Sequence, residues 1–155
     1  MPLLRAALSW NFVLATAICA SLLAQLIKVL LNLFIFHRFI AERMWGAGGM
    51  PSSHSATVCA MVVATGRYCG VNSPIFAIAA VLSIIVMYDA MGVRYETGEQ
   101  AKVLNRMFTE WMVQGFEQFQ LPHGKKLKEM VGHTPIEVVT GAALGIVLGF
   151  AMPMV

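Results

Sequence analysis

Four apolar stretches separated by polar segments organise the chain. They cover residues 7–36, 51–66, 74–92 and 135–152. A helix of about 20 apolar residues crosses the hydrocarbon core of a bilayer. The second stretch is short for a span, so we expect it to be tilted or only partly embedded. The pattern predicts an all-α integral membrane protein with four transmembrane helices, in a single domain over residues 1–155.

A fifth segment, residues 96–119, has a mixed pattern. Apolar residues recur there at helical spacing among charged ones: Val103, Met107, Phe108, Trp111, Met112 and Phe116. Such spacing is typical of an amphipathic helix. We expect this helix to lie on the membrane interface or on the other helices.

Composition supports the membrane setting. Of 155 residues, 58% are hydrophobic and 12% are charged, whereas soluble domains have about 45–50% and about 25%. The net charge is +3 and the basic residues are not interleaved with aromatic ones, which argues against nucleic-acid binding. Two of the three cysteines lie in apolar stretches. We therefore interpret the cysteines as small packing residues that reveal little about redox compartment.

The lysines and arginines are unevenly distributed between the two sides of the predicted spans. Arg5 and Arg67 lie on one side, and the loops after the first and third spans hold Arg38, Arg43, Arg94, Lys102, Arg106, Lys125, Lys126 and Lys128. Cytoplasmic loops carry the excess of lysine and arginine. This predicts both termini outside and both polar helix starts, near residues 51 and 134, at the cytoplasmic face of the membrane.

Two polar strings adjoin the apolar stretches. The first is Gly48-Gly49-Met50-Pro51-Ser52-Ser53-His54-Ser55, and the second is Gly132-His133-Thr134-Pro135-Ile136-Glu137. Proline suits the first helical position, and helix N-termini bind phosphate through free amides. His133 and Glu137 are one turn apart, so the carboxylate can hold one ring nitrogen while the other acts as nucleophile or base. The alternative for this pair is a packing face that begins with a capping histidine.

The first span contains a lysine well inside its length. Lys28 belongs to a polar stripe of Ser21, Gln25, Lys28 and Asn32, and an ionisable residue at such depth indicates function. The alternative is a lysine whose charged end reaches the interface. In the last span, Gly141, Gly145 and Gly149 recur every four residues, which predicts close approach of another helix.

Two other chemistries fit less well. Asp89, Glu96 and Glu99 could collect a hard cation, but no histidine or cysteine cluster has the spacing of a metal site. We therefore predict no metal. A serine hydrolase is also disfavoured, because Ser53 lacks the strand–turn–helix setting of such nucleophiles.

These strings resemble motifs of a known family. Pro51-Ser52-Ser53-His54-Ser55 and His133-x-x-x-Glu137-Val138-x-x-Gly141 are similar to the second and third motifs of the type 2 phosphatidic-acid phosphatase superfamily, which includes the vanadium-dependent haloperoxidases. With the strings Asp89–Arg94 and Leu127–Pro135, the chain resembles a small divergent bacterial and plant branch, from about Gln25 to Gly149.

The resemblance implies a metal-independent phosphatase without a cofactor, acting on a lipid phosphate or pyrophosphate. His133 would attack phosphorus, Glu137 would orient it and His54 would protonate the leaving oxygen. Lys28 would correspond to the lysine of the first motif. Amides around Ser52 and Ser53 would hold phosphate oxygens, in keeping with catalysis by positioning and charge neutralisation.

The sequence also departs from the family pattern. Ser53 stands where the family has glycine, Glu137 stands for aspartate, and the Arg-Pro pair of the first motif is absent. The arginine before the later histidine is missing too, with Lys126 and Lys128 nearby. We expect Arg94, oriented by Asp89, to supply a guanidinium, with Lys128 as a further substrate-binding residue.

Four spans fall short of the family's six-helix core, and a homodimer would supply the missing packing surface. The missing arginines motivate an alternative function, a non-catalytic lipid-phosphate binder or transporter that retains the fold. A purely structural membrane protein is a third reading. Isoprenoid phosphates, phosphatidic acid and phosphatidylglycerol phosphate all fit the predicted site, so the sequence does not name the lipid.

Overall fold

The computed structural model describes residues 11–36, 49–113, 126–129 and 131–154. These residues form five helices: α2 (Phe12–Phe36), α4 (Ser53–Cys69), α5 (Pro74–Met91), α6 (Val93–Val113) and α7 (Pro135–Ala151). The described part of the chain contains no strand, and the all-α prediction is confirmed. Part of the predicted amphipathic helix, with Phe116, lies outside the described residues, as do the basic residues Arg5, Arg38, Arg43 and Lys125.

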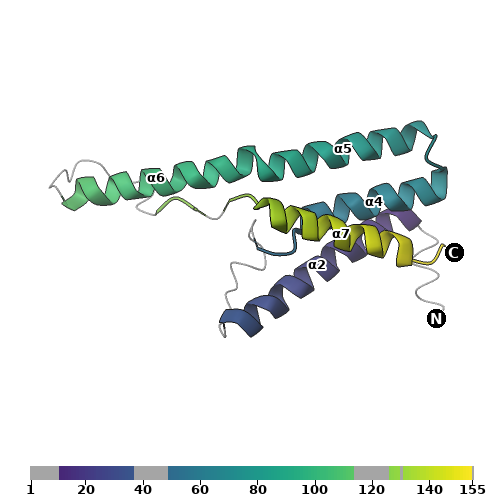
Figure 1. Ribbon diagram of the computed structural model, residues 1–155, viewed down its shortest axis with the longest axis horizontal. Coiled ribbons are helices and arrows are strands. Elements are labelled where there is room, and N and C mark those ends of the chain that lie inside the picture. The colour runs from purple at the N-terminus through teal and green to yellow at the C-terminus, as the bar shows by residue number, and fades with distance from the viewer. Residues whose placement is uncertain (1–10, 37–48, 114–125, 130, 155) are drawn as a thin grey trace.

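Helix α4 is central to the bundle, since it packs against α2, α5 and α7 (Figure 1). Helix α5 is followed after Gly92 by α6, which continues in nearly the same direction and extends beyond the bundle. Among the described helices α6 contacts only α5. The sequence left two placements open for the amphipathic helix, on the membrane interface or on the other helices. Beyond the junction at Gly92, α6 does not pack on the other described helices, so the second placement is wrong there.

Small residues allow α7 to approach α4 closely. A Cβ on Gly141 or Gly145 would collide with the carbonyl oxygen of Ser52 or Ala56, and one on Gly149 would lie 2.7 Å from Cβ of Val63. Alanines fill the contact between α4 and α2, and Leu144 and Leu148 of α7 pack against the same cluster: Ala20, Ala24, Ala56 and Ala60. The predicted close approach at the glycines is confirmed, and α4 is the partner helix.

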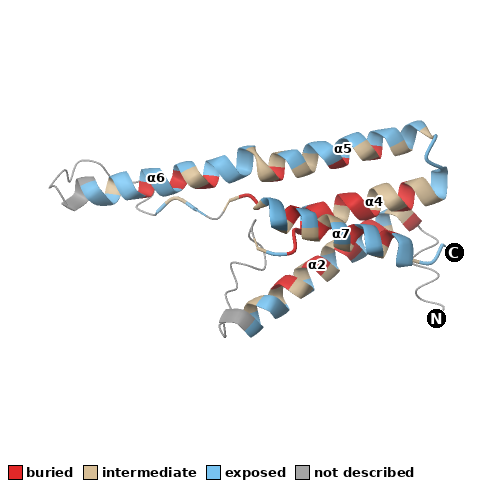
Figure 2. Ribbon diagram, in the orientation of Figure 1, coloured by how far each residue is buried: buried red, intermediate tan, exposed pale blue. Residues whose placement is uncertain are grey.

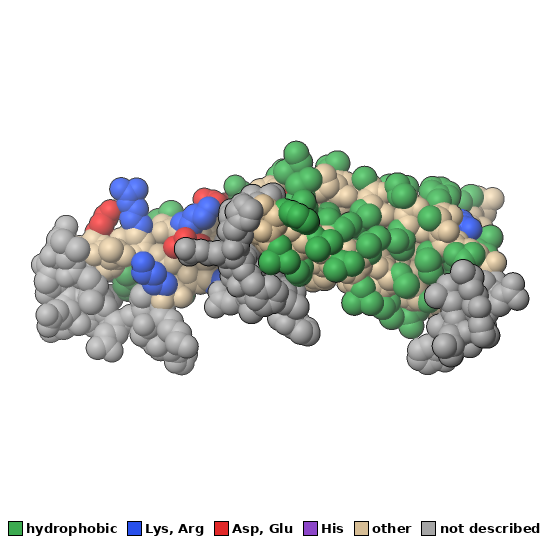
Figure 3. All heavy atoms as spheres, turned by 90° about the horizontal axis from the view of Figure 1, so that it is seen from below, with side chains coloured by type: hydrophobic (Ala, Val, Ile, Leu, Met, Phe, Trp, Pro, Cys, Tyr) green, Lys and Arg blue, Asp and Glu red, His purple; other side chains and the backbone are tan. Residues whose placement is uncertain are grey.

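The outer faces of the bundle are apolar. Large hydrophobic side chains are exposed along α2, α5 and α7, whereas charged side chains gather along α6 (Figures 2 and 3). Two stretches, Phe12–Phe34 and Pro74–Glu110, are long and apolar enough to cross a bilayer. Within the most apolar 18 residues of each stretch, only 28% and 17% are buried in the protein. Core helices of a soluble protein would be mostly buried. The protein is thus an all-α membrane protein. The charged helix α6 extends from one end of the apolar bundle, and that end is called its polar end.

The helix starts agree only partly with expectation. Helix α7 begins with Pro135 at its first position after the N-cap Thr134, as predicted. Helix α4 begins at Ser53 instead, because Ser52 is the N-cap. The expectation that Pro51 opens this helix is therefore wrong, since Pro51 precedes the cap.

Candidate active site

Two main-chain hydrogen bonds bring the polar helix starts together. The Ser52 amide donates to the Glu137 carbonyl oxygen at 2.9 Å, and the His133 amide donates to the Ala90 carbonyl oxygen at 3.0 Å. The first joins the start of α4 to the start of α7. The second joins the residue before α7 to the end of α5. Three helix ends thereby converge at one point of the bundle.

The two histidines face each other at this point. The ring centroids of His54 and His133 lie 5.9 Å apart, with the ring planes at 63°. Both line a cavity of about 330 Å³, whose other walls are formed by Ile85, Val86, Asp89, Ala90 and Arg94. His133 is almost fully buried, whereas His54 is exposed. Residues far apart in sequence thus line one cavity.

Glu137 fixes the orientation of the His133 ring. Its Oε2 lies 3.2 Å from His133 Nδ1 and accepts the Thr134 amide at 3.0 Å. The other ring nitrogen, Nε2, is buried and has no hydrogen-bond partner among the described residues. With Nδ1 donating to the carboxylate, the lone pair of Nε2 is available. His133 precedes the helix, so this contact forms across the helix start rather than along one helical face.

Burial governs the charge state of His133. It lowers the pKa of the imidazole below its ordinary value, and the carboxylate of Glu137 opposes that effect. The positive charge of Lys28 and the neighbouring His54 add to the lowering. His133 is therefore neutral at pH 7, the form in which an imidazole nitrogen can act as nucleophile or base.

Arg94 and Asp89 form an ion pair at the cavity wall. Arg94 Nε donates to Asp89 Oδ2 at 2.5 Å, and about half of the arginine side chain is exposed. This contact uses Nε, and within the described residues no hydrogen bond to the two terminal nitrogens is seen. The structure thus brings the expected guanidinium and its orienting carboxylate to the histidines.

The serines at the start of α4 are engaged within the protein. The Ser52 hydroxyl, fully buried, accepts the Ser55 amide at 3.3 Å and lies 3.1 Å from the Ser55 hydroxyl. Since the Ser52 amide is also bonded, this residue caps α4. The Ser53 hydroxyl accepts a 3.4 Å hydrogen bond from Gln25 Nε2. Phosphate contacts from either serine remain a prediction.

Lys28 is buried beneath the first polar string. Only 2% of it is exposed, and a Cβ on Gly49 would lie 3.4 Å from its Cδ. Its charge acts on Glu137, His54 and His133, although it does not line the 330 Å³ cavity. Of the predicted polar stripe, Ser21, Gln25 and Asn32 are only half-buried. The buried face of α2 consists of Phe12, Thr16, Ala17, Ala20, Ala24 and Lys28.

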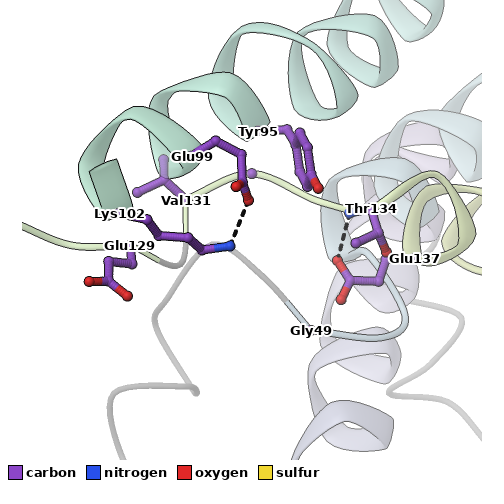
Figure 4. Close-up of a pocket in the computed structure, with 9 residues that line it drawn as sticks. Gly49, Tyr95, Glu99, Lys102, Glu129, Val131, Thr134 and Glu137 are labelled. Atoms are coloured by element: carbon purple, nitrogen blue, oxygen red, sulfur yellow. Dashed lines mark hydrogen bonds and ion pairs between the residues drawn. The ribbon is translucent and has the colours of Figure 1, made fainter. Parts of the chain in front are cut away.

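A second cavity, of about 140 Å³, lies on the α6 side of Glu137 (Figure 4). Its charged groups are Glu99, Lys102, Glu129 and Glu137, and Lys102 Nζ donates to Glu99 Oε1 at 2.6 Å. Lys128 is exposed and lines neither this cavity nor the larger one. The structure therefore does not bring Lys128 to the histidines.

Sequence reasoning missed two contributors to the site. The Ala90 carbonyl oxygen accepts a hydrogen bond from the His133 amide, and no side-chain pattern signals such a main-chain bond. Asn105, 5% exposed, bonds the segment that leads to His133. The sequence does contain a signal for Asn105. It shares one helical face with the small residues Gly98 and Ala101, and such a face allows another segment to approach closely.

Fold and site together define an all-α membrane protein with paired histidines at the polar end of an apolar bundle. The chain belongs to the Divergent PAP2 family, whose model matches residues 9–148. It is 38% identical over 144 residues to the uncharacterized membrane protein YuiD of Bacillus subtilis (strain 168), an alignment that covers 89% of this chain and 91% of that protein. No solved structure matches the chain.

Proposed function

We propose that the protein is a metal-independent phosphatase that hydrolyses a lipid phosphate or pyrophosphate through a phosphohistidine at His133. The observation that carries this proposal is the opposed pair of rings, 5.9 Å apart across the cavity, with His133 Nε2 unpartnered among the described residues and Nδ1 held by Glu137. A nucleophile held by an orienting carboxylate, with a second proton carrier opposite, suits covalent catalysis.

The reaction has two steps. In the first, the Nε2 lone pair of His133 attacks phosphorus, the bond from phosphorus to the lipid oxygen breaks, and His54 gives that oxygen a proton. In the second, water attacks the phosphohistidine, His54 takes a proton from the water, and the nitrogen–phosphorus bond breaks to release phosphate. Arg94 neutralises charge on the phosphoryl oxygens, and Glu137 stabilises the positive imidazole of the intermediate.

The lining of the cavity supports an amphipathic substrate. Arg94 and the two histidines form its polar part, while Ile85, Val86 and Ala90 form an apolar wall on α5. Ile85 is 58% exposed on the outer surface of that helix, so an apolar chain can lie against α5 while its phosphate reaches the histidines. We place the site at the cytoplasmic face of a bacterial plasma membrane, with both termini outside, because the basic residues adjoin the polar end.

A second candidate is a lipid-phosphate binding or transport protein without turnover. The Asp89 carboxylate lines the same cavity and pairs with Arg94. This ion pair reduces the net positive charge that Arg94 offers to the phosphoryl group during its transfer. The exposed apolar faces also suit the homodimer expected from the sequence. In either function the ligand is a phosphorylated lipid.

The test is release of labelled phosphate from lipid mono- and diphosphates by purified protein in lipid-containing micelles. We expect wild type to release phosphate and to form an alkali-stable, acid-labile phosphoprotein, and His133→Asn to do neither. His54→Asn should slow turnover by about 10²–10⁴-fold, the usual contribution of a general acid. Arg106→Gln, an exposed change on α6 away from the cavity, is the control.

Equal phosphate release by wild type and His133→Asn would refute the catalytic assignment. Saturable binding of these lipids without release, across both substrate types, would instead support the binding or transport protein.

A further inference from the structure

The segment that leads into His133 is bonded to α6 through Asn105. Asn105 Nδ2 donates to the Leu127 carbonyl oxygen at 2.9 Å and to Glu129 Oε1 at 2.8 Å, and its Oδ1 accepts the Leu127 amide at 2.9 Å. One buried side chain thus satisfies both main-chain polar groups of Leu127. The segment gains from α6 the bonds that a neighbouring strand would otherwise supply.

Glycines let the rest of the segment lie directly on the α6 backbone. A Cβ on Gly98 would lie 2.6 Å from the Glu129 carbonyl oxygen and 2.9 Å from that of Val131. Gly132, with φ of +87°, packs against the backbone of Arg94 and Tyr95 so closely that a Cβ would overlap it. The described residues on either side of position 130, 127–129 and 131–132, are therefore held along three turns of α6.

This attachment connects two parts of the site. Arg94 belongs to the first turn of α6, and Asn105 lies about 16 Å further along it at 1.5 Å per residue. The segment attached at Asn105 returns toward the bundle and ends at His133. The attachment at Asn105 therefore acts together with the Ala90 carbonyl and the Glu137 carboxylate on the position of the His133 ring relative to the Arg94 guanidinium.

We propose that Asn105 is a positioning residue: it fixes residues 126–129 on α6, ahead of His133 in the chain, so that His133 faces the cavity opposite Arg94 and His54. This inference rests on the proposed function for its effect on turnover. Its effect on the environment of His133 does not require turnover. Asn105 itself touches neither cavity.

The first experiment uses Asn105→Leu, which removes all three bonds. A displacement of about 1 Å at a reacting group costs about a hundredfold in rate, so we expect kcat to fall by that order. NMR titration of the His133 imidazole in the same protein should show its pKa rising toward the ordinary value of about 6.5, because the released ring gains water. Arg106→Leu, the neighbouring exposed position, should change neither quantity.

A second experiment separates positioning from a general loss of stability. Asn105→Asp places a carboxylate against Glu129 and loses the donors, and we expect it to behave like Asn105→Leu. Adding Glu129→Gln provides an amide donor opposite the introduced carboxylate, and it should restore part of kcat and lower the His133 pKa again. Glu129→Gln alone should be close to wild type, since Asn105 can still donate to the introduced amide oxygen.

Unchanged kcat and unchanged His133 pKa in Asn105→Leu would overturn the proposal. A fall in activity that only matches the loss of folded protein, with the His133 pKa unchanged in the folded fraction, would overturn it too. If wild type shows no turnover, the proposed phosphatase function fails, whereas the titration of His133 still decides the role of Asn105.

Discussion

Replacing Glu137 by glutamine tests how the carboxylate supports His133. The substitution keeps the size of the side chain and one acceptor oxygen, but removes the negative charge. In the native site that charge lies 3.2 Å from His133 Nδ1, and the two side chains are only 2% and 20% exposed. Solvent screening of the pair is therefore weak.

The expected magnitude follows from the charge that would form during the proposed phosphoryl transfer. Phosphorylation of Nε2 makes the imidazole of His133 positive. An opposite charge within about 4–6 Å favours a charged group by about 1–3 pKa units, and each unit is about 1.4 kcal/mol. Glu137→Gln should thus raise the barrier to phosphohistidine formation by about 1.4–4 kcal/mol, which slows it by about 10- to 1,000-fold.

Glu137→Gln should also change the pH dependence of the reaction, because it lowers the pKa of His133. Glu137 raises the pKa of His133 against the lowering caused by burial, with Lys28 and His54 also acting to lower it. Removal of the carboxylate leaves the lowering influences, so His133 stays neutral to a lower pH. Because only the neutral ring attacks, the acid limb of kcat/KM should move to lower pH while the plateau falls.

The assay is rapid-quench formation of the alkali-stable phosphoprotein from labelled lipid phosphate, measured over a range of pH. Glu110→Gln is the matched control, since Glu110 pairs with Arg106 on the exposed face of α6. An unchanged rate in Glu137→Gln, or an acid limb that moves to higher pH, would refute the reasoning. Partial unfolding alone would lower the plateau without moving the limb downward.

Two further substitutions test the binding group and the packing. Arg94→Ala should reduce kcat/KM for lipid phosphate by about a hundredfold, because it removes a group that stabilises transition-state charge. The control Arg106→Ala should leave kcat/KM unchanged. An equal loss in both variants would exclude a specific role for Arg94. Gly145→Val places a side chain against the Ala56 carbonyl and should destabilise the bundle by about 1–3 kcal/mol through overpacking. Thermal unfolding in detergent measures this, and Ala143→Val on the exposed face of α7 should leave the midpoint unchanged.

The parts of the fold that depend on local chemistry were predictable from the sequence. The apolar stretches marked α2, α4, α5 and α7, because a helix in a bilayer needs a continuous apolar surface. Thr134 followed by Pro135 marked the start of α7. The four-residue spacing of His133 and Glu137 anticipated their contact, and the glycine spacing in α7 anticipated a closely packed helix.

Features set by tertiary context were not predictable. A proline before a cap and a proline after one look alike in sequence, so Pro51 was wrongly placed inside the helix. An amphipathic pattern shows that a helix has two different sides but does not identify its neighbours, and α6 uses its small-residue side to hold a peptide segment. Proximity in sequence also suggested Lys128, which is exposed and lines neither described cavity.

The two main-chain hydrogen bonds at the site have a consequence for how freely this protein can mutate. Because Ser52 donates through its amide and Ala90 accepts through its carbonyl, these bonds do not depend on the side chains at either position. Of the twenty residues, only proline at position 52 would lack the amide that the first bond needs, although the buried Ser52 hydroxyl has a separate role as the cap of α4. Chemical groups around the histidines can therefore be exchanged one at a time while the scaffold keeps its register. A site built this way suits laboratory evolution toward new ligands, provided that libraries leave the backbone of these residues undisturbed.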